Sequence, residues 1–322
     1  MTDKGTACDV LCAEISSSGV APNAACGFYA ADADEFVVGG ETDALFDLAS
    51  VTKPIFAVAF ARSGLDRTAP LGAMLEAARG TPADGAPLEL LFAHRAGFPA
   101  HLELWREEDP IGTACRSRSG PMPAAPLYSD VGYVIAGRAA AGEDVGPFVD
   151  EHLVSRLGLS DVLGSARMLE ARGVDVARRA PPTEPADRRG RVHDENAWAL
   201  AREGACGHAG FFGTVEAVLR FGQHVLQNLA AYDWLIRPRE GGTLRAGFDG
   251  KSPEGSSAGS VLGRRSFGHL GFTGTSVWID PDARIVVALL TNRVCPTREN
   301  LRIREARPRV HDALARLALG AT

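Results

Sequence analysis

A serine and a lysine lie three residues apart in the segment Ser50–Val51–Thr52–Lys53. Residues three apart lie on the same face of a helix, so this spacing would bring the hydroxyl next to the amine. Serine becomes a strong nucleophile only when a base takes its proton, and a partly buried lysine can be that base. At a helix N-terminus the serine N–H would also point outward, ready to bind a developing oxyanion. An ordinary helix start can have the same spacing, so the motif alone is only suggestive.

The helix that must position this pair is predicted over Ala49–Ser63. Its apolar side chains recur at helical spacing and would form one buried face: Val51, Ile55, Val58 and Phe60. Proline lacks an N–H and fits only the first turn of a helix, so Pro54 requires the helix to begin close to Ser50. The hydroxyl is therefore expected at the N-terminal end of this helix.

A tyrosine and a carboxylate form a second motif, Tyr128–Ser129–Asp130. The motif follows a proline-rich loop, Pro121–Pro126, and precedes a helix that is predicted over Val134–Ala141. A tyrosine close to a lysine can take a proton as a phenolate and later return it to a leaving group. The alternative is a packed tyrosine at a helix start, with Asp130 serving as the cap.

A glycine-rich segment from His269 to Thr275 is the third motif, and it leads into a predicted strand over Thr275–Ile279. Glycine at position 271 (Gly271) would let a ligand approach the backbone of an edge strand closely. The N–H of Phe272 would then be a second oxyanion donor. Alone, the segment is more typical of a strand entry with a structural histidine.

Predicted strands lie near both ends of the chain, and helices fill the middle. Short strands are expected at four places: Cys26–Tyr29, Glu35–Val38, Thr275–Ile279 and Arg284–Thr291. Residues 69–177 are expected to be mostly helical, followed by a loop, a helix, a second loop and a closing helix: Arg178–Asn196, Phe211–Leu229, Pro238–Ser260 and a segment that starts at Pro308. This order predicts an α/β (α+β) fold with one sheet built from both termini and a helical lobe inserted between them.

The order and setting of the three motifs resemble the active site of class C β-lactamases and related peptidases and esterases. That site has Ser-x-x-Lys on a helix, Tyr-x-Asn on a loop of the helical lobe, and Lys/His-x-Gly on a strand. Five further stretches are similar to the same serine β-lactamase and penicillin-binding-protein superfamily: Phe46–Lys53, Leu91–Gly97, Val192–Ala197, Gly207–Gly210 and Leu290–Arg293. The resemblance covers the chain from about Pro22 to the C-terminus.

The resemblance implies a β-lactamase/transpeptidase-like fold, in which an antiparallel sheet flanked by helices packs beside an all-helical lobe. The sheet lobe would comprise residues 1–65 and 200–322, the helical lobe residues 66–199, and the site would lie in the cleft between them. The resemblance also implies that Ser50 forms an acyl-enzyme, with Lys53 and Tyr128 as proton carriers. The N–H groups of Ser50 and Phe272 would bind the oxyanion, and no cofactor would be needed.

Two departures from the family pattern bear on the substrate. The asparagine of Tyr-x-Asn is Asp130, and the lysine of the third motif is His269. A histidine that is mostly neutral weakens anion recognition, and an added carboxylate repels an anion further. Asp130 could instead pair with Lys53 or His269 and keep it charged. Both changes favour an ester or amide whose reactive end is neutral or cationic.

Two further histidines, His193 and His208, lie in the segments that are similar to the family. Each is a candidate for substrate binding, together with Asp130, His269 and Gly271, and each has a structural role as its alternative. No histidine or cysteine spacing matches a metal site, because the six cysteines are scattered and no Cys-x-x-Cys pair occurs.

The composition limits the kinds of partner that the protein is expected to have. The chain of 322 residues has a formal net charge of −6, so no basic footprint for nucleic acid is expected. No run approaches the roughly 18–20 apolar residues of a membrane span, and the polar, acidic N-terminus does not resemble an export signal. The sequence therefore predicts a cytoplasmic protein whose partner is a small molecule.

The leading hypothesis is a carboxylic-ester hydrolase, because a small neutral ester is met inside a cell whereas peptidoglycan and β-lactams are met outside it. The alternatives are an amide hydrolase, meaning a D-amino-acid-type peptidase or weak β-lactamase, and a non-catalytic protein that traps a ligand or acyl group. Retention of Ser50, Lys53 and Tyr128 argues against the trap. A metal enzyme is the last alternative, and the scattered histidines argue against it.

Overall fold

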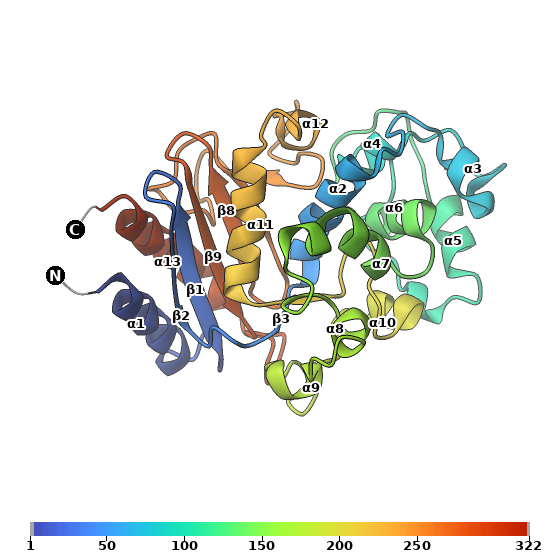
Figure 1. Ribbon diagram of the computed structural model, residues 1–322. Helices are drawn as coiled ribbons and strands as arrows, with labels where there is room; N and C mark the ends of the chain where they lie inside the picture. The colour runs from blue at the N-terminus through green and yellow to red at the C-terminus, as the bar shows by residue number, and fades with distance from the viewer. Residues whose placement is uncertain (1–2, 321–322) are drawn as a thin grey trace.

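The sheet is built from both ends of the chain, as the sequence predicted (Figure 1). This computed structural model describes residues 3–320; residues 1, 2, 321 and 322, which the predicted sheet lobe includes, lie outside the described part. Six antiparallel strands follow the order β2-β1-β9-β8-β7-β6, with β1 joined to β9 along its whole length. Their bounds are β1 Ala24–Ala30, β2 Glu35–Gly40, β6 Asp249–Gly250, β7 Phe267–Leu270, β8 Ser276–Asp280 and β9 Ile285–Thr291.

Helices cover both faces of this sheet. Helices α1 (Lys4–Ser17) and α13 (Ile303–Ala318) pack on one face, and α11 (Val215–Gln227) packs on the other (Figure 1). Strand β9 is buried at every position, which explains its almost continuously apolar sequence. Helix α1 was not predicted, because its polar residues hide a narrow buried stripe of Cys8, Cys12 and Ile15.

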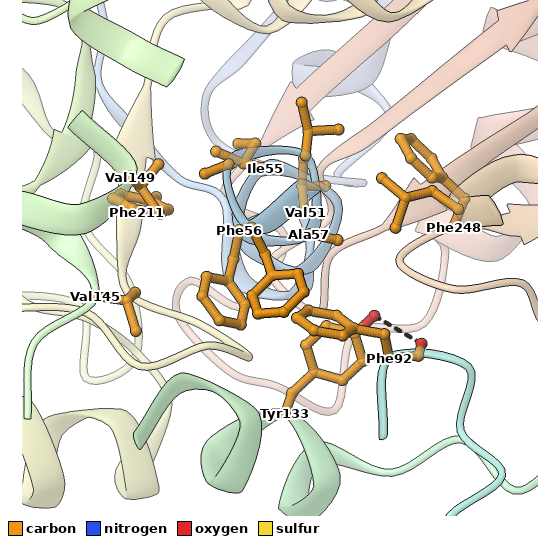
Figure 2. Close-up of a cluster of buried hydrophobic side chains, with 14 of the residues drawn as sticks. Val51, Ile55, Phe56, Ala57, Phe92, Tyr133, Val145, Val149, Phe211 and Phe248 are labelled. Carbon is orange, nitrogen blue, oxygen red and sulfur yellow. Dashed lines mark hydrogen bonds between the residues drawn. The ribbon is translucent and has the colours of Figure 1, made fainter. Parts of the chain in front are cut away.

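The middle of the chain surrounds α2 (Thr52–Ser63), the helix that carries the lysine. Figure 2 shows the side chains of Phe92 and Tyr133 beside Phe56 of this helix, and the hydroxyl of Tyr133 donates to the Phe92 carbonyl at 2.9 Å. The remaining α-helices of the described residues are α3 Leu71–Met74, α4 Leu88–Phe92, α5 Pro110–Arg116, α6 Asp130–Ala141, α7 Gly146–Val149, α8 Ala166–Glu170, α9 Val176–Arg179, α10 Glu195–Ala201 and α12 Asp233–Ile236, and a π-helical segment covers Asp150–Val154. Because α2 is buried on most sides, it is a rigid support for residues at its N-terminus.

A second, smaller sheet corrects the expectation of an all-helical lobe at residues 66–199. Strand β4 (Leu163–Ser165) lies within that segment and pairs with β5 (Phe211–Gly213), which pairs in turn with β3 (Phe46–Asp47). The first residues of the predicted helix 211–229 are therefore a strand, because long-range pairing satisfies their backbone. The boundaries proposed for the two lobes stay a prediction.

The boundaries of the remaining elements differ only slightly from those predicted from the sequence. The predicted loop over 178–196 is irregular from Ala180 to Asp194, and the connection over 238–260 contains only the two-residue strand β6. The closing helix begins at Ile303 rather than at Pro308, since apolar contacts of Ile303 and Ala306 extend its buried face beyond the proline. Among residues 3–320, no helix is long and apolar enough to cross a membrane.

Candidate active site

Ser50 lies in a single 3₁₀ turn, Ala49–Val51, that leads directly into α2. Ala49 has a φ of 45°, a left-handed conformation that is strained for a residue with a Cβ. The buried carboxylate of Asp47 holds this turn, because its two oxygens accept the N–H of Ala49 at 2.8 Å and the N–H of His193 at 2.7 Å. Burial raises the pKa of Asp47 to about 6, although both hydrogen bonds oppose the rise.

Lys53 is fully buried, and its Nζ contacts three acceptors. It donates to Ser50 Oγ at 2.7 Å and to the carbonyl oxygen of His208 at 3.2 Å, and it forms an ion pair with Asp130 Oδ1 at 2.7 Å. Three acceptors match the three N–H bonds of an ammonium group, so the geometry fits the charged form. Burial lowers the pKa of Lys53, but the charges of Asp130 and Tyr128 outweigh burial and raise it overall.

Asp130 begins α6, where the Ser129 hydroxyl caps the helix by accepting the N–H of Gly132 at 3.0 Å. The structure therefore decides between the two partners considered for Asp130, and its ion pair is with Lys53. Burial raises the pKa of Asp130, but the charges of Lys53 and His208 and the hydrogen bond to Lys53 together lower it overall. At neutral pH the two groups form a charged pair directly behind the serine.

Tyr128 lies against the same lysine, with Lys53 Nζ 4.9 Å from the centre of its ring. Burial raises the pKa of Tyr128, while the charge of Lys53 and hydrogen bonds to Lys53 and Ser50 oppose the rise. His94 stacks on the other side at 4.8 Å, and its Nδ1 accepts the N–H of Ser129 at 2.9 Å. Burial, with the charge of Lys53, lowers the pKa of His94 to about 3, so His94 is a neutral support for the tyrosine.

His269 is on β7, with its ring centre 6.0 Å from that of Tyr128. Its Nδ1 lies 2.8 Å from the carbonyl oxygen of Leu270, and because a carbonyl only accepts, Nδ1 carries the proton. Burial, helped by the charge of Lys53, lowers the pKa of His269 to about 3. The position where the family pattern has a lysine is therefore neutral, as the substrate argument required.

The turn after β7 packs tightly against the segment before the serine. The N–H of Gly271 donates to Thr275 at 2.7 Å, and a Cβ on Gly271 would lie 2.5 Å from the carbonyl oxygen of Leu48. Only glycine permits this approach. The N–H of Phe272 has no acceptor among residues 3–320, which leaves it available as the predicted oxyanion donor.

A pocket of about 540 Å³ opens over the serine. It is lined by residues from both of the predicted lobes: Ala49, Ser50, His101, Glu103, Trp105, Tyr128, Asp130, His193, Asp194, Glu195, Ala209, Leu270, Phe272 and Arg298. The predicted residues Ser50, Tyr128, Asp130, His193 and Phe272 therefore share one pocket. A larger hollow of about 670 Å³, at residues 297–305, lies away from these residues and contains none of the chemistry above.

The two candidate histidines have different positions. His193 lines the pocket and stacks on Phe272 at 5.8 Å, and burial lowers its pKa. His208 is buried behind the wall, where its Nε2 lies 2.8 Å from Asp194 Oδ1. His208, His269 and Gly271 do not form part of the lining, and their role in substrate binding stays a prediction.

Several residues of the site were missed by sequence reasoning, namely Asp47, Asp194, Trp105 and Arg298. Asp47 and Asp194 lie inside segments that resemble the family, and this was the available signal. Trp105 and Arg298 gave none, because isolated aromatic and basic residues in loops are common. Among residues 3–320, no group of three or more histidine, cysteine or acidic side chains is arranged to hold a metal ion.

Comparison with known proteins agrees with this geometry. A family model described as Beta-lactamase matches residues 25–310. A curated relative from Escherichia coli O157:H7, named "Putative D-alanyl-D-alanine carboxypeptidase", is 24% identical over 243 residues, which are 63% of this chain and 56% of the relative. The chain thus spans about half the length of the curated relatives it matches.

Solved structures share the fold. A class C β-lactamase from Rhodobacter sphaeroides has a TM-score of 0.70 at 18% identity, covering 96% of this chain and 98% of its own. EstCE1, described as a hydrolase with promiscuous acyltransferase activity, has a TM-score of 0.67 at 17% identity, covering 95% and 98%. The fold is that of β-lactamases and penicillin-binding proteins, as predicted. With most of its length matched by the family model, this chain belongs to the Beta-lactamase family.

Proposed function

We propose that this protein is a serine hydrolase that cleaves carboxylic esters through an acyl-enzyme at Ser50. The observation that carries the proposal is Lys53, which bridges Ser50 Oγ and Asp130 at 2.7 Å each inside a pocket large enough for a small ester. The neutral His269 supports a substrate without an anionic group, which argues against β-lactams. The cytoplasmic location and the absence of nucleic-acid and membrane partners stay predictions.

The proposed reaction has two steps. Ser50 Oγ attacks the ester carbonyl carbon while its proton passes to the Tyr128–Lys53 pair, and the N–H groups of Ser50 and Phe272 bind the oxyanion. Tyr128 then protonates the departing alcohol oxygen as the C–O bond breaks, leaving the acyl group on Ser50. Water then attacks this ester while its proton passes to the pair, and the pair returns a proton to Ser50 Oγ as the acyl C–O bond breaks and the acid is released. Each oxyanion donor contributes a factor on the order of 10²–10³ in rate.

An amide hydrolase is the second candidate, because the curated relatives are named after a carboxypeptidase. The same acyl-enzyme serves both reactions, and an amide differs in needing a stronger proton donor for its leaving nitrogen. A protein that only traps an acyl group is the third candidate.

The first prediction separates these candidates by substrate. We expect purified protein to hydrolyse short p-nitrophenyl esters quickly and a chromogenic cephalosporin slowly, because no fixed cation is available for the cephalosporin carboxylate. Release of nitrophenol and opening of the lactam are followed by absorbance, with Ser50→Ala protein as the control. Cephalosporin turnover equal to ester turnover would contradict the argument from Asp130 and His269. A single burst of nitrophenol without turnover would favour the trap.

The second prediction concerns pH. The pair must lose one proton before it can take one from Ser50, and both Lys53 and Tyr128 have raised pKa values. Ester hydrolysis should therefore increase from neutral to alkaline pH. The charge of Asp130 raises the pKa of both groups, so Asp130→Asn should move this increase to lower pH.

The measurement is kcat/KM for one p-nitrophenyl ester across pH. Asp161→Asn is a matched control, since Asp161 is exposed and does not line the pocket. An identical pH profile for Asp130→Asn and the unmodified protein would exclude this role of Asp130.

A further inference from the structure

Asp194 presents a carboxylate oxygen without a partner to the pocket. It caps α10, where its Oδ1 accepts the N–H of Ala197 at 2.8 Å and also contacts His208 Nε2 at 2.8 Å. Both bonds use the same oxygen. Among residues 3–320, Oδ2 has no hydrogen-bond partner, and Asp194 lines the pocket beside Ser50.

The buried His208 fixes the position of the Asp194 carboxylate. His208 is buried, and its carbonyl oxygen accepts from Lys53, so Asp194 is connected to the catalytic lysine through one residue. Burial raises the pKa of Asp194, but the charge and hydrogen bond of His208 hold it well below the ordinary range. The oxygen is therefore a permanent negative charge close to the reacting serine.

The other charges of the pocket are already paired. Asp130 pairs with Lys53, while Arg298 contacts Glu184 Oε2 at 2.6 Å and Glu195 Oε1 at 2.7 Å. The remaining lining carboxylate, Glu103, pairs with an arginine at the surface. Within the described part of the chain, Asp194 has no lysine or arginine partner.

The rest of the pocket wall adds uncharged surface beside this carboxylate. Burial lowers the pKa of His193, which lines the pocket, and the pKa of His269, which lies outside the lining. The side chains of Trp105, Tyr128 and Phe272 also line the pocket and give it an aromatic surface, although cations of the protein already lie against these rings. The pocket thus combines a carboxylate whose Oδ1 is held by His208 and whose Oδ2 has no partner with aromatic surface and no unpaired cation among the described residues.

We propose that Asp194 Oδ2 binds a cationic group of the substrate, so that the enzyme prefers esters with an ammonium group near the ester carbonyl. This inference rests on the proposed ester hydrolysis and names its substrate class. An ammonium group would supply the missing partner of Oδ2 and be attracted by the carboxylate, whereas an uncharged group of equal shape would leave Oδ2 without a partner.

The test uses pairs of esters that differ only in charge. Acetylcholine and 3,3-dimethylbutyl acetate carry a quaternary nitrogen or a carbon in the alcohol part, and betaine methyl ester and methyl 3,3-dimethylbutanoate do so in the acyl part. Acid release is followed in a pH-stat, with the uncatalysed rate subtracted. We expect kcat/KM to favour the cationic member of at least one pair by about tenfold or more. The Asp194→Asn variant should lose that preference.

Asp194→Asn is a conservative change, because asparagine also caps a helix and can accept from His208. The ratio of kcat/KM for two esters does not depend on the fraction of folded enzyme, so partial misfolding cannot imitate the result. Asp161→Asn removes the same charge from an exposed site outside the pocket and should leave the ratio unchanged. Equal cleavage of both members in both pairs, or an unchanged ratio in Asp194→Asn, would overturn the inference.

Binding measurements test this inference independently of the proposed ester hydrolysis. Calorimetry with Ser50→Ala protein measures the affinity for acetylcholine and for 3,3-dimethylbutyl acetate, with betaine methyl ester and its neutral counterpart measured alongside. A preference for a cation that disappears in the Ser50→Ala, Asp194→Asn double variant supports the role of Asp194 even if the unmodified protein hydrolyses no ester. Equal affinities within both pairs would overturn it, whatever the catalytic result.

Discussion

Replacement of Lys53 by methionine should reduce kcat/KM for esters by about 10⁴-fold, because a positioned acid–base group contributes on the order of 10²–10⁴ in rate. Lys53 also orients Ser50 Oγ through a 2.7 Å hydrogen bond, which places its loss at the upper end of that range. Methionine fills a similar volume, so the packing around α2 is largely kept. The measurement is hydrolysis of a p-nitrophenyl ester at saturating and limiting concentrations.

The same change should lower the free energy of unfolding by about 3 kcal/mol, since breaking a buried ion pair leaves one charge without a partner. That charge is Asp130, whose side chain is 24% exposed. The double variant Lys53→Met, Asp130→Asn should recover most of this loss while remaining inactive. Denaturant unfolding of the two variants provides the comparison.

Lys4→Met is the matched control for the lysine change. Lys4 pairs with Glu35 at the surface, so its replacement should cost less than about 1 kcal/mol and leave hydrolysis intact. Equal unfolding free energies for the single and double variants would show that Asp130 does not depend on Lys53. Substantial ester hydrolysis by either variant would remove Lys53 from the proton path.

Replacement of Ser50 by alanine should reduce hydrolysis by a factor on the order of 10⁶, as expected when the nucleophile of a serine hydrolase is removed. The residual rate would reflect binding and the two oxyanion donors alone. Stability should change little, because the side chain of Ser50 faces the pocket and its loss leaves no cavity in the core.

Intact mass spectrometry checks the covalent step of the same prediction. A fluorophosphonate should add once to the unmodified protein and to Ser16→Ala, an exposed serine outside the pocket, but not to Ser50→Ala. Digestion should place the adduct on the peptide that contains residue 50. An adduct on another residue, or near-normal hydrolysis by Ser50→Ala, would contradict the acyl-enzyme at this position.

The sequence alone determined the features that depend on short spacing. Ser50 and Lys53 are three residues apart, and Pro54 limits where their helix can begin, so their contact follows from helical geometry. The strands at 276–280 and 285–291 follow from a short turn between apolar runs, and they are observed within one residue of the predicted start. The placement of Tyr128 in the same site was predicted only through the resemblance to a family.

The tertiary structure decided the contacts between distant segments, because local patterns do not specify which distant groups meet. Asp130 pairs with Lys53 rather than His269, and Asp47 joins the turn before Ser50 to His193. Strand β4 also exists only because β5 supplies its backbone partners. Sequence spacing thus determined the nucleophile and its lysine, whereas the packing of separate segments determined the charge of the pocket, since burial and ion pairing depend on neighbours that folding brings together.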